Sequence, residues 1–550
     1  MITRLSSIAE QARFKSDGLP KTVSNSLKIC VWVLILVGFA ARLIPFVDLN
    51  ERLFWQYMTE DGYLLQTVAR NISIGLGMSV AEGTQHTNGV QPLATYLYAA
   101  LHFIAGGSKK EGIALVTLFS VLVSVGAGYY AYKVASRVFT SIRHGRELAI
   151  VTATLWFAAP HTIRHSMNGL ETGIYFFAIL FTFNYYLTAI SDDSRPFTLR
   201  KRLALGLLMG FTFLARNDAV FFIGGVLLAH LVVGDEKVGG GHRHRLIDSL
   251  IVGIVSLLVA SPWLINHYAL FGSIVPISGI SESRDAHFGQ NLSGIPAQLF
   301  TSTYIFAPIP GAIAHTPLVI LMSMTGVTLS LAGFWLFSAK FTLLSRRFFL
   351  GSLIFAVGIS SYYGIFFGAP YFLGRYLYPL SPLLWIATTA TTFFLLNLLV
   401  RSYEGVQRIA FPIVLILTLG ASTFAYSDFA RGYAKGTSHD HKHVVKWVQE
   451  NVPATQWVGA PQSGTLGFFH DRTINLDGKV NPFALRAILE HGNVLEYIRN
   501  SKIDYIADWR LNLDWTKIKS DPQFGKEFEV VVRDEQSNLG ILRRIHPVEQ

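Results

Sequence analysis

Long apolar segments, separated by short polar ones, recur over residues 29–426. A run of about 17–25 mainly apolar residues can cross the hydrocarbon core of a bilayer as a helix. We therefore expect a polytopic α-helical membrane protein with about eleven transmembrane helices. The shortest pair, 203–216 and 219–235, could form a hairpin that does not fully cross. The expected segments are 29–47, 112–136, 147–165, 172–190, 203–216, 219–235, 246–268, 315–338, 348–368, 377–399 and 409–426.

A further apolar segment, 92–106, is too short to assign by length alone. If it crossed the membrane, the basic cluster Arg137–Arg146 would lie outside. If it lies in the membrane interface, that cluster stays on the side of the other basic loops. Because cytoplasmic loops carry an excess of Lys and Arg, we expect the interfacial position.

The same rule orients the chain. It places residues 1–28 in the cytoplasm, and the first apolar segment is a retained anchor because no clear small-residue cleavage site follows it. The outside face then holds loop 48–111, the turns 161–171 and 369–376, loop 269–314 and the tail.

The tail, residues 427–550, differs in kind from the rest. Its apolar runs are short, as at 456–460, 505–507 and 528–532, and they alternate with amphipathic helical stretches at 441–450 and 483–499. This alternation predicts a small exoplasmic α/β domain after a transmembrane domain that covers 29–426.

Composition supports this class of protein. The chain of 550 residues is 51% apolar and 15% charged, and its net charge of +11 fits basic cytoplasmic loops. No basic patch is interleaved with aromatic residues, so we expect no nucleic-acid partner. The single cysteine, Cys30, excludes an intramolecular disulfide and a cysteine metal site. We see no internal repeat, which counts against a transporter built from repeated halves.

Ionisable residues gather on the outside face. They are Glu60 and Asp61 at the start of the first loop, Arg164, His165 and Glu171 in the second turn, Asp218 at the end of a short segment, and Arg375 before another. Acids and bases beside lipid suit a reaction between a lipid-borne substrate and a partner outside. Each also has a plainer explanation.

The acidic pair could be a solvated loop, Arg164 and His165 could be interfacial residues, and Arg216 could form a structural ion pair with Asp218. A lone outside arginine such as Arg375 runs against the positive-inside bias, which favours a function for it. His161 and His165, four residues apart, are a weak metal signal because no third ligand is placed near them.

The order of several motifs resembles the GT-C superfamily of membrane glycosyltransferases. Glu60-Asp61-Gly62-Tyr63 leads to Ala69-Arg70, as in the superfamily's first outside loop, where an Asp opens a helix. Further likenesses are Thr87-Asn88-Gly89-Val90-Gln91-Pro92-Leu93, Glu171 in Asn-Gly-Leu-Glu-Thr, Leu214–Asp218, Arg375-Tyr376 with Pro379, and in the tail Gly464–Phe469 and Leu476–Asn481. Where some relatives place a phosphate-binding Lys or a His before the proline, this chain has Gln91.

The resemblance implies an enzyme that moves a sugar from a polyprenyl-phosphate donor to a glycan, lipid or protein acceptor on the outer face of a bacterial inner membrane. It implies Asp61 as general base, with Glu60 and Glu171 shaping its field. It implies Arg375 as the phosphate ligand, with weaker candidates in Arg164 and His165 and further substrate contacts from Tyr63, Asn88 and Gln91. A carboxylate can take the acceptor proton, and the phosphate leaving group needs positive charge rather than an acid. A single displacement predicts inversion, with no metal or cofactor required.

Two alternatives remain at this stage. A flippase or transporter for lipid-linked saccharides would use the acids to steer its cargo and would consume no donor. An O-antigen polymerase or ligase would place its main loop late in the chain, and the early acidic loop argues against it. Loop 269–314 and the tail are expected to face the acceptor.

Overall fold

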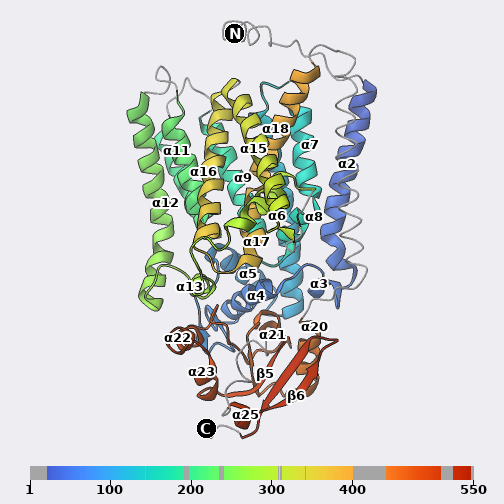
Figure 1. The fold of residues 1–550 in the computed structure, drawn as a ribbon, viewed down its shortest axis with the longest axis vertical. Helices are drawn as coiled ribbons and strands as arrows, with labels where there is room; N and C mark the ends of the chain where they lie inside the picture. The colour runs from blue at the N-terminus through green and yellow to red at the C-terminus, as the bar shows by residue number, and fades with distance from the viewer. Residues whose placement is uncertain are drawn as a thin grey trace.

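The protein is a bundle of long helices with an α/β domain at one end (Figure 1). The computed structural model describes residues 21–142, 144–190, 197–234, 241–306, 309, 313–340, 342–400, 441–509 and 524–546. The bundle helices are α2 (Lys21–Leu43), α6 (Lys109–Val138), α7 (Gly145–Ala158), α9 (Thr172–Ala189), α10 (Leu199–Ala215), α11 (Ala219–Val232), α12 (Gly241–Phe271), α15 (Pro317–Lys340), α16 (Leu343–Ile365) and α18 (Ser381–Val400).

Five helices within these described ranges are long and apolar enough to cross a membrane. They cover Leu27–Val47, Lys109–Val138, Gly241–Phe271, Pro317–Ala339 and Leu343–Ile365. The chain is thus a mainly helical membrane protein, and the number of about eleven spans stays a prediction. The expected segment 409–426 lies outside the described residues.

Two expected segments are divided by proline. Residues 147–165 form α7 and then α8 (Pro160–Met167), with Ala159 between them in an extended conformation. Proline has no N–H for the helix ladder and disfavours the helical conformation in the residue before it. Residues 377–399 likewise begin in the short helices α17 (Leu373–Leu377) and η5 (Tyr378–Leu380) before α18.

The basic helix ends lie together at the end of the bundle opposite the C-terminal domain (Figure 1). There Arg245 Nε donates to the carbonyl of Leu231 at 3.2 Å, and Arg347 Nε donates to that of Val233 at 2.8 Å. The start of α2 lies at the same end of the bundle. The basic helix ends thus share one end of the bundle, and its cytoplasmic side stays a prediction.

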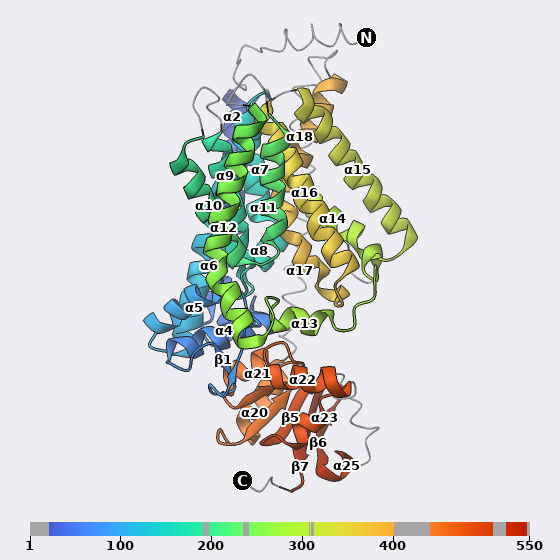
Figure 2. The same ribbon diagram turned by 90° about the vertical axis from the view of Figure 1, so that its left-hand side faces the viewer.

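The other end of the bundle carries residues 48–111, which we call the first outside loop after the side expected for it. It contains α3 (Arg52–Trp55), α4 (Glu60–Ser73), the hairpin β1 (Ser79–Val80) and β2 (Gln85–His86), and α5 (Pro92–Ile104), and the short helix η1 (Ile44–Val47) precedes it. Helix α5 has 13 residues, about 20 Å at 1.5 Å per residue, which is too short to cross. Figure 2 shows it beside α4 at this end of the bundle, where the interfacial position was expected.

Loop 269–314 runs along the same end. Its described residues form α13 (Ile277–Ser283), η2 (Leu292–Gly294) and α14 (Ile295–Thr303). Figure 2 shows α13 between the bundle and the C-terminal domain. The loop is therefore placed where it can touch both parts.

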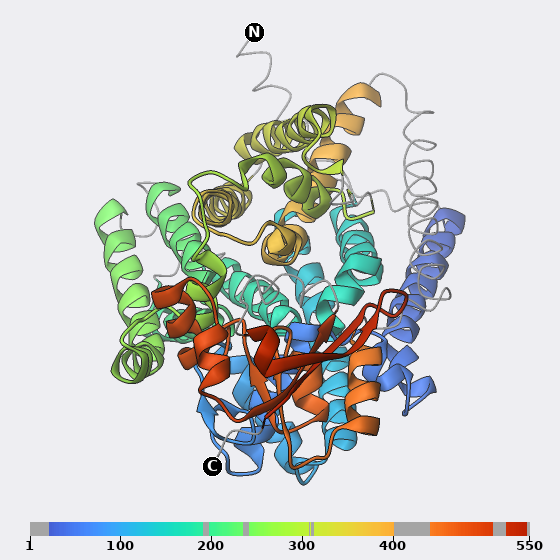
Figure 3. The same ribbon diagram turned by 60° about the horizontal axis from the view of Figure 1, so that its bottom comes forward.

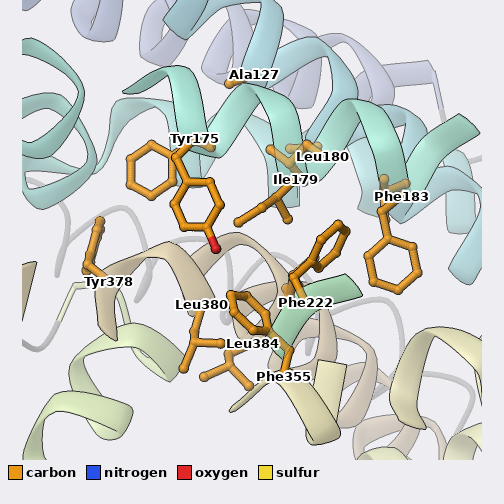
Figure 4. Packing of buried hydrophobic residues seen from close by; sticks show 14 of the residues in the cluster. Ala127, Tyr175, Ile179, Leu180, Phe183, Phe222, Phe355, Tyr378, Leu380 and Leu384 are labelled. Carbon is orange, nitrogen blue, oxygen red and sulfur yellow. The ribbon is translucent and has the colours of Figure 1, made fainter. Parts of the chain in front are cut away.

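The bundle core is rich in aromatic side chains. Figure 4 shows Tyr175 and Phe183 of α9 facing Phe222 of α11, Phe355 of α16 and Leu384 of α18. Phe183 and Phe222 meet edge-to-face with ring centroids 5.7 Å apart. Burial of this surface fixes α9 at the centre of the bundle and holds the helix ends that carry the outer loops.

The C-terminal domain is built on one mixed sheet. The strands β3 (Trp457–Ala460), β4 (Thr473–Asn475), β5 (Ile503–Trp509), β6 (Phe528–Asp534) and β7 (Leu539–Arg544) lie in the order β4-β3-β5-β7-β6. The β4-β3-β5 part is parallel and the rest is antiparallel. The helices are α20 (Lys442–Asn451), α21 (Gly464–Phe469), α22 (Pro482–His491), α23 (Leu495–Arg499) and α25 (Phe524–Glu527). The α/β prediction is confirmed for this region.

The domain lies across the end of the bundle, over the first outside loop (Figure 3). One apolar cluster contains Leu64 and Val68 of α4 together with Leu476, Val480 and Ile488 of the domain. The two parts thus share a core, and α4 is held between them.

Candidate functional site

Asp61 lies in the first turn of α4 between two cations. Thr59 caps the helix, its side chain accepting a hydrogen bond from the Gly62 N–H at 3.2 Å. Arg375 of α17 donates from Nη1 to Oδ2 of Asp61. Lys479 of the C-terminal domain places Nζ 4.0 Å from the other oxygen, Oδ1. Three segments far apart in the chain therefore meet at one carboxylate.

The first turn of α4 is packed tightly against the turn between α8 and α9. A Cβ on Gly62 would lie 2.2 Å from the carbonyl oxygen of Asn168, so only glycine fits there. The hydroxyl of Thr59 donates to the same carbonyl at 3.1 Å. This contact fixes the direction in which the neighbouring Asp61 side chain leaves the helix.

One aromatic ring lies against both cations. Phe372 has the Arg375 guanidinium carbon 4.3 Å and Lys479 Nζ 5.0 Å from its ring centroid. Arg375 also donates from Nη2 to the hydroxyl of Tyr376 at 3.1 Å. The negative face of an aromatic ring attracts a cation, so Phe372 helps to hold the two positive charges side by side.

Lys479 is surrounded by acids. Its Nζ lies 2.7 Å from Glu282 of α13 and 3.6 Å from Asp477, in addition to Asp61. Only 13% of its side chain is exposed. Burial raises the pKa of Asp477 to about 6, against the lowering effect of Lys479.

The carboxyl of Asp61 is ionised in this setting. Burial alone would raise its pKa, but the charges of Lys479 and Arg375 outweigh burial and hold the pKa below its ordinary value. Burial opposes the charged form of Lys479, but the carboxylates of Asp61, Asp477 and Glu282 outweigh it and raise the pKa of Lys479 well above that of a free lysine. At neutral pH the site therefore holds a carboxylate that can accept a proton beside two cations that can bind an anion.

A second charged group lies next to this centre, on the bundle side. Arg216 pairs with Asp218, as expected for a structural ion pair, and its Nε lies 3.8 Å from Glu171. Tyr363 donates its hydroxyl to Asp218 at 2.9 Å. The negative charge of Glu171 also acts on Arg375. Glu171 thus lies close enough to shape the field of the site, and it has no contact with Asp61 among those that the structure describes.

Glu60, next to Asp61 in the chain, faces the C-terminal domain. Its carboxylate accepts hydrogen bonds from the N–H groups of Gly464 and Thr465, from the Thr465 hydroxyl and from His441 Nδ1, the last at 2.7 Å. His441 Nε2 lies 3.0 Å from Asp508 Oδ1. Adjacent helical residues point about 100° apart, so one acid enters the site while the other fastens the domain. We call Glu60, His441, Asp508 and Thr465 the domain anchor.

We expect Glu60→Gln to loosen the C-terminal domain. The amide would present its NH₂ to N–H donors of α21 and would remove the charge beside His441. Leaving such buried groups unsatisfied costs about 1–3 kcal/mol. Hydrogen exchange should therefore speed up in Gly464–Phe469 relative to wild type, while Glu111→Gln, an exposed acid on the same face, should leave it unchanged.

The anchor also predicts a pH limit. Burial opposes the charged form of His441, but Glu60 and Asp508 outweigh it and raise its pKa to about 10. A base whose folded pKa is raised stabilises the fold fully below its unfolded pKa of about 6.5 and loses this as pH rises through the folded pKa. The melting temperature of the wild type should therefore fall as the pH rises from about 6.5 to about 10, where only the folded state holds the proton, and it should fall less steeply in His441→Gln. Equal slopes in the two proteins, or unaltered exchange in Glu60→Gln, would contradict the anchor.

The Thr-Asn-Gly turn connects the outer segments. Asn88 is buried and accepts a hydrogen bond from the Ile277 N–H, at 3.1 Å, which holds the start of α13. A Cβ on Gly89 would lie 2.0 Å from the carbonyl oxygen of Lys479, so this glycine admits the C-terminal domain. Gln91 begins α5, and its Oε1 is buried with no partner among the described residues. The turn positions Lys479 and α13, and none of its side chains contacts Asp61 within the described part of the chain.

Three further predicted residues lie apart from Asp61. Tyr63 is fully buried, donates to the Phe54 carbonyl at 2.7 Å and packs on Phe468, so it serves the contact between α4 and the domain. His165 stacks on Tyr378 with centroids 4.7 Å apart, and Arg164 is exposed on α8. These positions follow from the helix periods of α4 and α8, which turn neighbouring side chains to different faces.

Lys479, Glu282 and Phe372 were missed as site residues. The segment Leu476–Asn481 attracted notice as part of the terminal domain, but its lysine carried no separate signal. The one local signal for a functional lysine is the polar Asp-Gly-Lys turn between the apolar residues Leu476 and Val480. Glu282 stands in a long Gly/Ser/Pro-rich loop, and such loops in compact proteins are often functional.

The helical bundle with an α/β domain over one end is a fold that this chain shares with known structures. Three solved structures with this fold match nearly the whole chain. Archaeal oligosaccharyltransferase AglB from Archaeoglobus fulgidus, in complex with an inhibitory peptide and a dolichol-phosphate, is 13% identical over 96% of this chain and 75% of its own, with a TM-score of 0.56.

ArnT from Cupriavidus metallidurans bound to undecaprenyl phosphate is 13% identical over 94% of this chain and 98% of its own, with a TM-score of 0.58. The same protein in the apo state is 14% identical over 95% and 98%, with a TM-score of 0.56. Residues 431–539 match a family described as a domain of unknown function (DUF8728). No curated protein matches the chain. These likenesses define the fold.

Proposed function

We propose that the protein is a membrane glycosyltransferase that moves a sugar from a polyprenyl-phosphate donor to an acceptor on the face that carries the C-terminal domain. The observation that supports this most directly is Asp61, held ionised beside Arg375 and Lys479 at the end of a membrane bundle. A base and anion-binding cations at one point suit transfer from a phosphate leaving group. The AglB structure in complex with a dolichol-phosphate and the ArnT structure bound to undecaprenyl phosphate favour this class of donor.

The charges suggest how the step proceeds. Arg375 can turn its planar fork from Asp61 to two oxygens of the donor phosphate. Asp61 then takes the proton of the acceptor hydroxyl or amine as the new bond forms at the anomeric carbon. The bond from that carbon to the phosphate oxygen breaks, and its electron pair stays on the phosphate. One displacement of this kind inverts the anomeric centre, and it requires no cofactor.

The neighbouring groups have supporting parts in this scheme. Glu171 moderates the positive charge of Arg216 and Arg375. His165 and Arg164, on α8, stay weaker candidates for substrate contacts. We place the site on the periplasmic side of a bacterial inner membrane, with the N-terminus in the cytoplasm.

We expect alkaline phosphatase to be active when it is fused after Gln550 and inactive when it is fused after Arg245. Alkaline phosphatase matures only outside the cytoplasm, and basic helix ends such as that of Arg245 stay inside. The measurement is phosphatase activity in intact cells, normalised to the amount of fusion protein. The reverse pattern would place Asp61 in the cytoplasm and would overturn the proposed orientation.

The proposal is tested by mass spectrometry of lipid-linked sugars and envelope glycans in cells with the wild-type protein, with Asp61→Asn and without the protein. A glycosyltransferase should deplete one polyprenyl-phosphate sugar and add that sugar to one glycan, lipid or protein, only in the wild type. A saccharide transporter would move its cargo without consuming it. Unchanged lipid-linked sugars in all three strains would therefore contradict the proposed activity.

A further inference from the structure

The C-terminal domain places one cation in the site, and the step above leaves its purpose open. We propose that Lys479 binds the donor phosphate together with Arg375, so that the membrane bundle and the C-terminal domain each supply one half of the phosphate site. This inference rests on the proposed function. It gives the tail a direct part in donor binding, beside the acceptor contact expected for it.

The positions of the two cations carry the inference. Lys479 Nζ lies 4.0 Å from Oδ1 of Asp61, and Arg375 donates to Oδ2 of the same carboxylate. Both also lie over the ring of Phe372, at 5.0 and 4.3 Å. Two cations that converge on one carboxylate and one ring can reach the oxygens of a single phosphate group.

The backbone that carries Lys479 is held from two sides. On one side its carbonyl oxygen rests against Gly89, where a Cβ would approach to 2.0 Å. On the other, the hydroxyl of Ser281 in α13 donates to the carbonyl of Asp477 at 2.8 Å. Because the main chain is wedged between the first outside loop and α13, the ammonium enters the site from a fixed direction, as preorganised electrostatic stabilisation requires.

The charge balance of the reaction gives the second cation a purpose. The donor is a phosphodiester with one negative charge, and the released polyprenyl phosphate is a monoester that gains a further charge as the carbon–oxygen bond breaks. Arg375 can neutralise the charge that the donor phosphate already has, and Lys479 can stabilise the charge that develops on the leaving phosphate oxygen. As both cations turn to the phosphate, Asp61 loses its two partners and its affinity for the acceptor proton rises.

Glu282 and Asp477 keep the ammonium in place before the donor arrives. Glu282 is the nearer, at 2.7 Å, and it competes with a phosphate for the same charge. This gives a sharp distinction between a binding role and a structural role for Lys479. Removal of Glu282's charge frees Lys479 for phosphate, whereas a merely structural ion pair would be damaged equally by the loss of either partner.

The test uses the full-length protein in detergent, with farnesyl phosphate as the probe and farnesol as its uncharged counterpart. The dissociation constant of each is measured for wild type, Lys479→Met, Lys479→Arg, Glu282→Gln and Arg375→Ala. We expect Lys479→Met to weaken farnesyl phosphate binding roughly tenfold or more, the loss of one charge-assisted hydrogen bond. Farnesol binding should not change, Lys479→Arg should retain most of the affinity, and Glu282→Gln should bind the phosphate more tightly.

Several results would overturn the inference. If Lys479→Met binds farnesyl phosphate as wild type while Arg375→Ala does not, Lys479 is no phosphate ligand and the proposed function stands. If Lys479→Met and Glu282→Gln weaken binding equally, the pair is structural. If hydrogen exchange shows that Lys479→Met undocks the C-terminal domain, the binding measured for Glu282→Gln replaces it as the test. An affinity of Glu282→Gln for farnesyl phosphate equal to that of wild type then refutes the inference. A wild-type protein that does not prefer the phosphate over the alcohol refutes both the inference and the proposed function.

Discussion

Asp61→Asn is expected to abolish most turnover while the protein still folds and binds its donor. Asparagine keeps the size of aspartate and can still accept a hydrogen bond from Arg375, but it cannot take a proton from the acceptor. Loss of a general base typically costs roughly 10²–10⁴-fold in rate. The measurement is release of polyprenyl phosphate by purified protein, alongside donor binding by the same preparation.

Two matched variants make this prediction specific. Glu60→Gln should lower turnover clearly less, because Glu60 acts on the domain anchor and has no contact with the acceptor in this scheme. Glu111→Gln, an exposed acid on the same face, should behave as wild type. Full activity in Asp61→Asn together with a dead Glu60→Gln would assign the base to Glu60. Full activity in both would favour a transporter.

Arg375→Ala is expected to weaken use of the lipid donor strongly. The side chain now holds Asp61 and the Tyr376 hydroxyl, and the donor phosphate would take the place of Asp61. Hydrogen bonds to charged groups contribute about 1.5–3 kcal/mol, which corresponds to roughly a 10–150-fold change in donor affinity. The change in donor affinity is measured from the dependence of the initial rate on donor concentration.

Arg375→Lys should restore only part of the affinity, because an ammonium cannot make the two-pronged contact of a guanidinium. Arg486→Ala is the matched control, since Arg486 is exposed on α22 of the C-terminal domain and lacks a contact with Asp61 among those described. The phosphate-binding role of Arg375 would be excluded if Arg375→Ala showed the donor dependence of wild type. A loss of equal size in Arg486→Ala would point to the surface charge as a whole.

The sequence predicted Asp61 and Arg375 as candidates because each breaks a local rule. An acid at the first membrane edge and a lone arginine on the outside face are both unfavourable without a partner. The structure brings these two together, which no property of either segment could show. Glu60 illustrates the opposite case, since its neighbouring position suggested a share in the chemistry and its contacts assign it to the domain anchor.

What the sequence by itself determined is the class of protein, the bundle helices that the structure describes, the shortness of the helix within 92–106 and the α/β character of the tail. These follow from local apolar runs, from the distribution of Lys and Arg, and from the periods of helix and strand, all of which act over a few residues. Only the tertiary structure decided that Lys479 and Glu282 join Asp61, and that the Thr-Asn-Gly turn admits them. These contacts depend on how the C-terminal domain packs on α4 and α13. That packing is set by the shape and charge of whole surfaces, which no local sequence period reveals.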